Sequence, residues 1–307
     1  MKPVEGANPR TDEAFASFCR QTYAGPTELI VGTVSESDPI VPVVHRLQQT
    51  FPDHRIRIVY APLLGTNRKT SIMQALWREA EGDYLFFSDA DVLVEPDYLE
   101  RLVTEFRSPA VGCVTCLPRG VCAETVGGRW IALHYDFSYL PQWMLARRTT
   151  GISWAIGHTM AVRRSVLEQL NGFLGFLNHL ADDYELGHRT TLLGFQVQVP
   201  PVLLDCTMPQ ETPLQTFRRL IRWKRTMRRA RGIAFLGVGL TYPVFWATVL
   251  TAINPLTLWA WATLGCTVLL RLLLAGRLQR QVQLPDWRRA WYWLPLLDLI
   301  EGLTFLG

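Results

Sequence analysis

Apolar residues in the first two thirds of the chain recur with two different spacings. Short continuous apolar runs are typical of buried strands, whereas apolar residues at i, i+3, i+4 and i+7 are typical of amphipathic helices. Strands are predicted over 28–34, 56–61, 84–90 and 110–116. Helices are predicted over 40–47, 70–82 and 96–106. This alternation predicts an α/β fold with a mostly parallel sheet covered by helices.

Carboxylates lie at or just past the ends of two predicted strands. Asp38 follows the strand at 28–34, and Asp89 and Asp91 lie where the strand at 84–90 ends, with Asp91 just past it. Ligands of open α/β sheets bind beyond the carboxyl ends of the strands. Two carboxylates at i and i+2 can share Mg²⁺ or Mn²⁺, and such an ion offsets charge on a departing diphosphate. The alternative is an Asp-rich turn without further role.

The composition changes after residue 212. The segment 213–231 has eight basic residues and no acidic residue, and its apolar residues recur at helical spacing. This pattern predicts a basic amphipathic helix at a membrane surface. A nucleic-acid-binding helix is the alternative. Because an uncharged apolar segment follows, we expect no nucleic-acid partner.

Two apolar segments come next. Residues 233–253 carry no charge over 21 positions, and a second apolar run covers 256–275 with Arg271 inside it. About 20 residues cross a bilayer as a helix, so a hairpin of two spans is predicted, with Asn254–Pro255 as its turn. Arg271 is expected to reach out toward the membrane interface.

The flanking charges predict which side of the membrane the chain faces. Residues 276–290 contain four Arg and one Asp. The positive-inside rule places this segment in the cytoplasm, and a hairpin then places residues 1–232 there too. The final segment, 291–307, is either a third span or an interfacial or re-entrant helix, because Asp298 and Glu301 are costly within a bilayer.

The net charge is divided unevenly along the 307 residues. Residues 213–307 hold 13 Lys and Arg against three acidic residues, a net charge of +10, whereas residues 1–212 have a net charge of −6. The split predicts an acidic catalytic or metal-binding part and a part that meets an anionic surface.

Six cysteines form no compact disulfide framework and fit a reducing compartment. Cys113, Cys116 and Cys122 are candidates for a zinc site, but no second pair of ligands lies nearby. Residues of a buried strand are the favoured interpretation.

Asp182 and Asp183 form a second acidic element, in the stretch HLADDYELGHR at 179–189. One of the two can serve as a general base that takes the proton from an attacking hydroxyl, and its neighbour can raise its pKa. The alternative is that acidic residues in a first helical turn simply complement the helix dipole.

A third element is Arg219-Leu-Ile-Arg222-Trp223. Positions i, i+3 and i+4 share one face of a helix, so two guanidinium groups can bind a diphosphate and Trp223 can cover it. A solvated basic face against lipid phosphates is the alternative.

These elements, in this order, resemble the inverting glycosyltransferases of family 2, which have the Rossmann-like GT-A fold. The resemblance is closest to the branch that contains the ceramide glucosyltransferases and bacterial hopanoid glycosyltransferases, which is similar to family 21. It covers nearly all of residues 2–300. The matching stretches are SESDPI, Asp89-Ala90-Asp91, ADDYELG, Arg219-x-x-Arg222-Trp223, and Gly65-Thr-Asn67-Arg-Lys69.

The resemblance implies a role for each matching residue. Asp183 is the catalytic base, and Asp89 and Asp91 hold the metal. Eight donor-side residues, Asp89 among them, would bind the nucleotide sugar: Asp38, Gly65, Asn67, Lys69, Asp89, Arg219, Arg222 and Trp223. Asp38 precedes Pro39 and can equally cap its helix. His158 and Asp182 would line the acceptor side, although a structural role for His158 is the alternative.

Two departures from the family accompany the resemblance. Its members have an N-terminal membrane helix and a first strand ahead of the segment that KPVEGANP resembles, and they continue beyond the last apolar segment. We therefore expect a chain shortened at one or both ends.

The predicted organisation is a GT-A domain over 1–212, an interface helix over 213–232 and a membrane region of two or three helices over 233–307. The predicted function is transfer of glucose or N-acetylglucosamine from a UDP-sugar to a lipid hydroxyl, such as that of ceramide or a hopanoid, with Mg²⁺ or Mn²⁺ as cofactor. The protein would be a multi-pass membrane protein whose catalytic domain faces the cytoplasm. A processive polysaccharide synthase and an inactive membrane scaffold are the alternatives.

Overall fold

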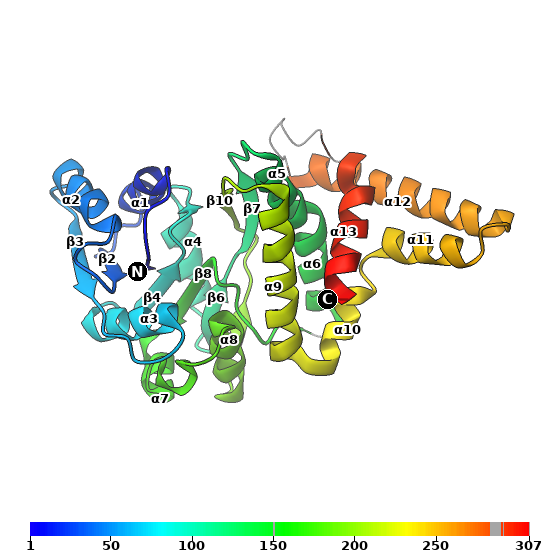
Figure 1. The fold of residues 1–307 in the computed structure, drawn as a ribbon. Coiled ribbons are helices and arrows are strands. Elements are labelled where there is room, and N and C mark those ends of the chain that lie inside the picture. The colour runs from blue at the N-terminus through cyan, green and yellow to red at the C-terminus, as the bar shows by residue number, and fades with distance from the viewer. Residues whose placement is uncertain (150, 283–289, 291, 307) are drawn as a thin grey trace. The chain divides into compact units, whose positions relative to one another are not determined.

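The chain folds into two compact units, one carrying the sheets and one formed mainly of helices (Figure 1). The computed structural model describes residues 1–149, 151–282, 290 and 292–306. The first unit comprises Met1–Arg119 and Thr150–Thr207, and the second comprises Gly120–Thr149 and Met208–Gly307.

Two sheets form the centre of the first unit. The first has the order β1-β2-β3, and its strands are all parallel. Its strands are β1 (Lys2–Pro3), β2 (Glu28–Thr33) and β3 (Arg55–Tyr60). The second has the order β4-β8-β6-β9, with strands β4 (Tyr84–Ser88), β6 (Val111–Thr115), β8 (Thr159–Arg163) and β9 (Gln196–Gln198). The four strands predicted from the apolar runs are confirmed as β2, β3, β4 and β6.

The expectation of a mostly parallel sheet is wrong for the second sheet. Strand β8 lies between β4 and β6 and is antiparallel to both, while β9 runs parallel to β6. A smaller sheet pairs β10 (Leu203–Thr207) with β5 (Val92–Leu93) in antiparallel fashion, and its third strand is β7 (Leu117–Val121). The fold is therefore α/β with mixed sheets.

Helices link these strands and cover the sheets. Those of the first unit are α1 (Thr11–Cys19), α2 (Ile40–Thr50), α3 (Arg68–Glu79), α4 (Tyr98–Glu105), α7 (Arg164–Leu170), the 3₁₀ turn η2 (Leu174–Phe176) and α8 (Asp182–Leu192). The three predicted helices are confirmed as α2, α3 and α4. One core joins the sheets to α3 through Ile30, Ile72, Leu76, Phe87 and Met160. Burying each such side chain contributes about 1.5–3 kcal/mol.

The first strand begins earlier than expected. Lys2 and Pro3, at the start of KPVEGANP, pair with Val31 and Gly32 of β2. These two residues therefore belong to a strand and do not follow one.

The second unit is built from helices. They are α5 (Val126–His134), the π-helical turn η1 (Tyr135–Tyr139), α6 (Leu140–Thr149), α9 (Pro213–Arg231), the 3₁₀ turn η3 (Gly232–Phe235), α10 (Leu236–Gly239), α11 (Pro243–Ile253), α12 (Leu258–Val282) and α13 (Leu294–Leu306). Helix α9 has the predicted bounds. It begins with a capping box between Thr212 and Gln215 and with Pro213 in its first turn, a combination that favours a helix start.

The apolar segment 233–253, predicted as the first span of a hairpin, is not one continuous helix. It breaks between Gly239 and Pro243, because proline has no backbone N–H and disfavours the helical conformation of the residue before it. Carbonyl groups freed by the break still find donors. Trp246 Nε1 donates to the carbonyl of Gly239 at 2.7 Å, and Thr241 Oγ1 donates to that of Val238 at 2.6 Å.

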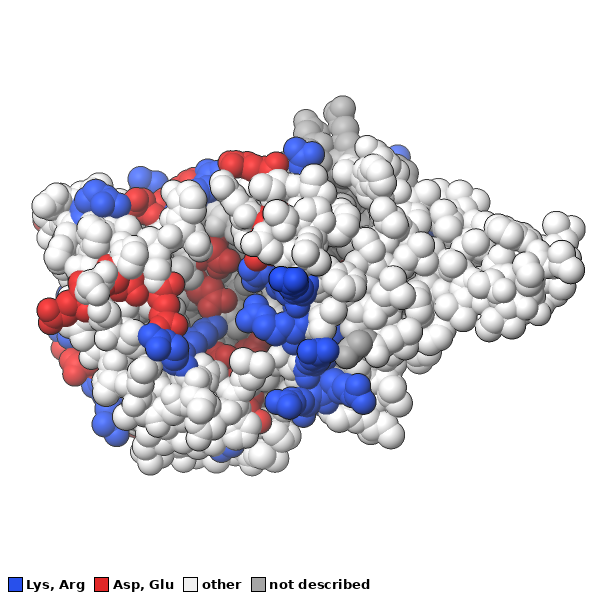
Figure 2. All heavy atoms as spheres, in the orientation of Figure 1, with Lys and Arg blue, Asp and Glu red and all other residues white. Residues whose placement is uncertain are grey.

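Helix α12 is the one described helix that is by itself long and apolar enough to cross a bilayer, over Leu258–Gln281. The pair Pro213–Gly239 and Pro243–Ile253, bent by 62°, would count as a second if taken as one broken span. Helix α11 has 11 residues, or about 16 Å, roughly half of the bilayer core. It packs along α12, and the Thr251 hydroxyl donates to the Ala260 carbonyl. Figure 2 shows the face of α11 and α12 in view almost without charged side chains.

Arg271 was expected to reach out toward the membrane interface. The structure contradicts this prediction. Arg271 lies within α12 and forms a two-pronged ion pair with Asp298 of α13, with both N–O distances 2.9 Å. Its Nη1 also donates to the carbonyl of Phe137. Of the basic segment 276–290 used to predict the cytoplasmic side, residues 283–289 lie outside the described part of the chain.

Candidate functional site

The pair Asp89 and Asp91 is held at the end of β4 by backbone contacts from neighbouring strands. The N–H of Asp89 donates to the carbonyl of His158, next to β8, at 3.2 Å. The N–H of Thr207, the last residue of β10, donates to the carbonyl of Asp91 at 2.9 Å. Both anchors act on the backbone and fix the position of the turn that carries the two carboxylates.

Lys2 of β1 supports the same turn, although it is not among the residues predicted from the sequence. Its buried Nζ donates to the carbonyl of Asp89 at 2.9 Å and to Oγ of Ser88 at 3.2 Å. It also lies 3.6 Å from the ring centroid of Phe18. Burial lowers the pKa of Lys2 to about 7, although Asp89 and Asp91 act against this shift.

Lys69 connects the two acidic elements. It extends from the first turn of α3, and its Nζ lies 2.7 Å from Oδ1 of Asp89 and 3.6 Å from Oδ2 of Asp182. Burial alone would lower the pKa of Lys69, but Asp182 and Asp89 raise it above its ordinary value. The amine therefore remains protonated, and one cation is shared by two motifs that are far apart in the sequence.

Asp183, the predicted base, is the second residue of α8. Its Oδ2 accepts a hydrogen bond from the N–H of Gly157 at 3.0 Å, and its Oδ1 accepts one from the N–H of Tyr184 at 2.8 Å. Burial and the neighbouring Asp182 raise the pKa of Asp183 to about 6. A carboxylate with this pKa is ionised at pH 7 and is a better proton acceptor than an ordinary Asp.

Gly157 is a second residue of the site that was not predicted from the sequence. A Cβ at this position would lie 3.4 Å from Oδ2 of Asp183 and 3.6 Å from Nζ of Lys69. Its neighbour His158, predicted to touch the acceptor, contributes its carbonyl, which accepts from the N–H of Asp89 and from Oγ of Ser88. Burial lowers the pKa of His158 to about 4, so the ring is neutral near pH 7.

Asp91 is the carboxylate best suited to hold a metal ion. Its Oδ1 is buried and has no hydrogen-bond partner among the described residues. Burial and the charge of Asp89 raise the pKa of Asp91 to about 6, and a bound cation would reverse this. No group of three His, Cys, Asp or Glu side chains in the described ranges could enclose an ion. A magnesium or manganese ion here would fit two carboxylates, with water and substrate phosphates as the other ligands.

Gly65 and Asn67, predicted to bind the nucleotide sugar, anchor a loop in this structure. A Cβ on Gly65 would lie 2.7 Å from both Cβ and the carbonyl oxygen of Leu177, so only glycine allows this close approach. Asn67 caps α3 by accepting from the N–H of Thr70, and its Nδ2 donates to the carbonyl of His179 at 2.7 Å. The loop is thus fixed to the segment that leads into Asp182.

Asp38, also predicted on the donor side, has both carboxylate oxygens engaged. It accepts from the N–H of Ile40, the first residue of α2, at 2.9 Å, and from the hydroxyl of Thr33 at 2.8 Å. The N–H of Gly6 donates to both of its oxygens, at 3.0 and 3.2 Å. The helix-end role considered as the alternative is therefore present, and contact with a nucleotide base stays a prediction.

The Arg219, Arg222 and Trp223 segment lies on α9, in the second unit. The guanidinium of Arg219 pairs with the carboxylate of Glu211, so this arginine already has an acidic partner. Arg222 is exposed, and Trp223 stacks on Tyr135 with ring centroids 6.0 Å apart. Binding of a diphosphate by this segment remains a prediction.

Comparison with solved structures supports the GT-A-like α/β fold. A mannosyltransferase from Pyrobaculum calidifontis, in complex with GDP-Man and Mn²⁺, aligns with a TM-score of 0.57 over 99% of this chain and 85% of that one, at 20% identity.

Curated relatives are similar over part of their length. Ceramide glucosyltransferase 1 of Caenorhabditis elegans is 24% identical over 229 residues, which are 73% of this chain and 48% of the relative. An N-acetylglucosaminyltransferase of Azorhizobium caulinodans is 22% identical over 239 residues, 72% of this chain and 57% of that one. The chain spans about half the length of these relatives. The sequence pattern of Glycosyl transferase family 21 matches residues 1–307, and the chain belongs to this family.

Proposed function

We propose that the chain is an inverting glycosyltransferase that moves a sugar from a UDP-sugar to a lipid hydroxyl at a membrane surface. The observation that carries the proposal is the setting of Asp183. Two backbone N–H groups orient its carboxylate, and burial raises its pKa into the range of an effective base.

Asp183 would take the proton of the acceptor hydroxyl as that oxygen attacks the anomeric carbon. Attack comes from the face opposite the diphosphate, so the configuration at that carbon inverts. The hydrogen bonds from Gly157 and Tyr184 leave lone pairs on each carboxylate oxygen that can accept the proton. Both donors belong to the backbone and fix the carboxylate in one orientation, which is what a positioned base requires.

The donor side would carry the positive charge that a departing diphosphate needs. Lys69 would contact the phosphates, and Asp89 with Asp91 would hold Mg²⁺ or Mn²⁺. A phosphate contact from Arg222 is carried over from the family resemblance. When bound, the ion supplies charge that stabilises the leaving group. The hydrogen bond to Asp89 already holds the Lys69 amine beside the predicted metal site, so this cation is preorganised for an anionic ligand.

Membrane attachment is inferred from the second unit. Helix α12 exposes Leu258, Leu269, Leu270, Leu273 and Leu274. Only 11% of its most apolar 18-residue stretch is buried. A contiguous apolar surface of this kind is rare on a soluble monomer. Curated relatives named for glucosyl and N-acetylglucosaminyl transfer favour one of these two sugars, and the one named for ceramide favours a lipid acceptor.

The proposal is tested with membranes that contain the full chain, total lipid extract and Mg²⁺ or Mn²⁺. Radiolabelled UDP-glucose and UDP-N-acetylglucosamine are offered in parallel, and label is counted in the organic phase. Label from one donor in a single glycolipid supports the proposal. A ladder of products would instead identify a processive synthase, and UDP binding without any transfer would identify a scaffold.

A further inference from the structure

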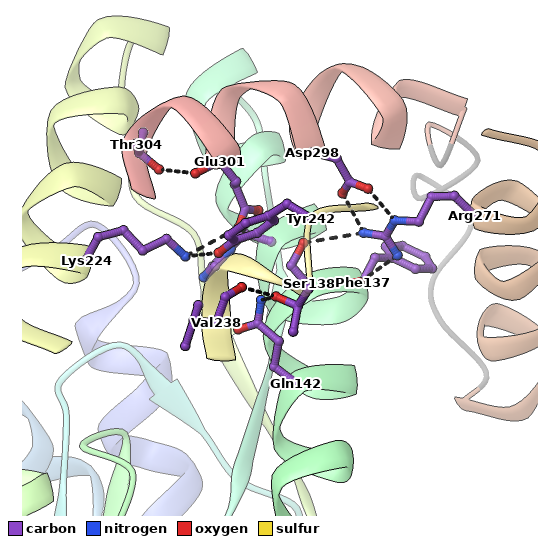
Figure 3. A network of polar contacts seen from close by, with 12 residues as sticks. Phe137, Ser138, Gln142, Lys224, Val238, Tyr242, Arg271, Asp298, Glu301 and Thr304 are labelled. Carbon is purple, nitrogen blue, oxygen red and sulfur yellow. Dashed lines mark hydrogen bonds and ion pairs between the residues drawn. The ribbon is translucent and has the colours of Figure 1, made fainter. Parts of the chain in front are cut away.

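Buried polar side chains from three segments of the second unit converge on Glu301 of α13 (Figure 3). Nδ1 of His134, at the end of α5, lies 2.9 Å from Oε1 of Glu301. Nζ of Lys224, in the middle of α9, lies 3.6 Å from Oε2 of Glu301 and contacts the hydroxyl of Tyr242. His134, Lys224, Tyr242 and Glu301 are each at most 4% exposed, and they are called the Glu301 cluster.

The cluster adjoins the predicted diphosphate-binding segment of α9 in sequence and through ring contacts. Lys224 is adjacent in sequence to Trp223, whose ring lies 5.8 Å from the ring of His134 and stacks on Tyr135. Arg222 precedes Trp223 and is exposed. Successive residues of an α-helix are about 100° apart around its axis, so a helix setting that buries Lys224 against Glu301 also determines where Arg222 points.

We propose that Glu301 is a positioning residue that fixes the rotational setting of α9 and thereby the direction in which the Arg222 side chain points. The physical reason is that a buried lysine charge without its partner is strongly unfavourable. Rotation of α9 by one residue would separate Lys224 from Glu301 and leave the lysine charge buried without its acidic partner. The ion pair therefore selects one setting of the helix. The inference rests on the proposed function in one respect, the binding of the donor's diphosphate by Arg222.

The same helix offers a matched control. Asp298 lies one turn before Glu301 on α13 and is also fully buried, but it pairs with Arg271 of α12. Removing its charge therefore alters α13 at a second buried position, whose ion pair is with α12 and not with α9. An effect shared by both variants would reflect general loosening of the unit, whereas an effect of Glu301 alone would reflect the setting of α9.

The experiment compares Glu301→Gln, Lys224→Met, Asp298→Asn and Arg222→Ala in the full chain, in membranes and in detergent. UDP affinity is measured by calorimetry, donor KM and kcat by transfer, and folding by thermal unfolding. We expect Glu301→Gln and Lys224→Met to weaken UDP binding and raise donor KM on the order of 5- to 10-fold, with kcat changed little. Asp298→Asn should leave UDP affinity unchanged. A double variant of Lys224→Met and Glu301→Gln, which leaves no charge unpaired, serves if either single variant fails to fold.

Comparison with Arg222→Ala separates the inference from the function on which it rests. If Arg222→Ala weakens UDP binding and Glu301→Gln adds nothing in that background, the two residues act through one another. If Arg222→Ala has no effect on UDP binding, the donor role of α9 fails and the inference fails with it. If Arg222→Ala weakens UDP binding but the folded Glu301 and Lys224 variants bind UDP normally, only the positioning role is overturned. The same holds if Asp298→Asn weakens UDP binding as much as Glu301→Gln.

Discussion

Nζ of Lys69 lies 2.7 Å from Oδ1 of Asp89. The two residues come from different elements, the start of α3 and the end of β4, and their contact joins the predicted donor motif to the predicted metal motif. Oδ2 of Asp182 lies 3.6 Å from the same amine, and the charge on Lys69 also lowers the pKa of Asp183. The chemistry of Asp183 is therefore set by its surroundings as much as by its own side chain.

The Asp183→Asn variant tests the base directly. It keeps the shape of the side chain but cannot accept a proton, so we expect turnover to fall by a factor on the order of 10² or more while UDP still binds. Initial transfer rates and calorimetric UDP affinity measure the two effects. Glu185→Gln, on the same helix and paired with Arg189, is the control. Near-normal turnover of Asp183→Asn would exclude this residue as the base.

The pH dependence of transfer should follow the pKa of Asp183. Since the base acts when ionised, kcat/KM should fall about tenfold for each pH unit below its pKa of about 6. The charge of Asp182 raises this pKa and that of Lys69 lowers it. Asp182→Asn should therefore move the acidic limb of the profile to lower pH, and Lys69→Met should move it to higher pH. Limbs that stay in place in both variants would show that another group titrates.

The metal requirement should depend on Asp91. Its buried Oδ1 has no protein partner in the described ranges, so Asp91→Asn removes a ligand without breaking a hydrogen bond of that atom. We expect chelation to abolish transfer, added Mn²⁺ to restore it, and Asp91→Asn to raise the half-saturating Mn²⁺ concentration by about tenfold or more. Mn²⁺ binding followed by electron paramagnetic resonance gives a readout independent of activity. The exposed Asp97→Asn variant should behave as the parent chain.

The loop at Gly65 should be sensitive to a single added methyl group. In Gly65→Ala the new Cβ would meet the backbone and side chain of Leu177 at 2.7 Å. Relieving such a contact typically costs about 1–3 kcal/mol in the free energy of unfolding. At Gly82 an added Cβ meets only one atom, at 3.5 Å, so Gly82→Ala should have little steric effect. Equal stability of the two variants in chemical denaturation would contradict the close approach.

The elements that hydrophobic periodicity could predict are those whose formation is mostly local. Strands β2 and β3 and helix α9 lie within one residue of their predicted bounds, because each has a clear apolar pattern and, for α9, a capping residue. The break before Pro243 was also readable, since proline limits its predecessor. The prediction of one span rested on the absence of charge over 233–253 and did not take Pro243 into account.

Other features depend on contacts between distant segments, which periodicity does not report. The insertion of β8 between β4 and β6 is decided by pairing across the sheet. The N–H of Gly157 that orients Asp183 is a backbone group. Almost every residue has such a donor, so the residue type does not indicate this role. In the same way, Lys2 gains its role only because β1 runs beside the end of β4.

The pairing of Arg271 with Asp298 gives the last prediction. Both side chains are largely buried, and they are 27 residues apart in sequence. Arg271→Met should lower the free energy of unfolding by about 3–5 kcal/mol, because it leaves the carboxylate of Asp298 buried without its partner. Adding Asp298→Leu removes that stranded charge. The double variant should therefore be more stable than Arg271→Met alone, as measured by thermal unfolding in detergent. If the two single effects simply add, the ion pair is not what stabilises this part of the second unit.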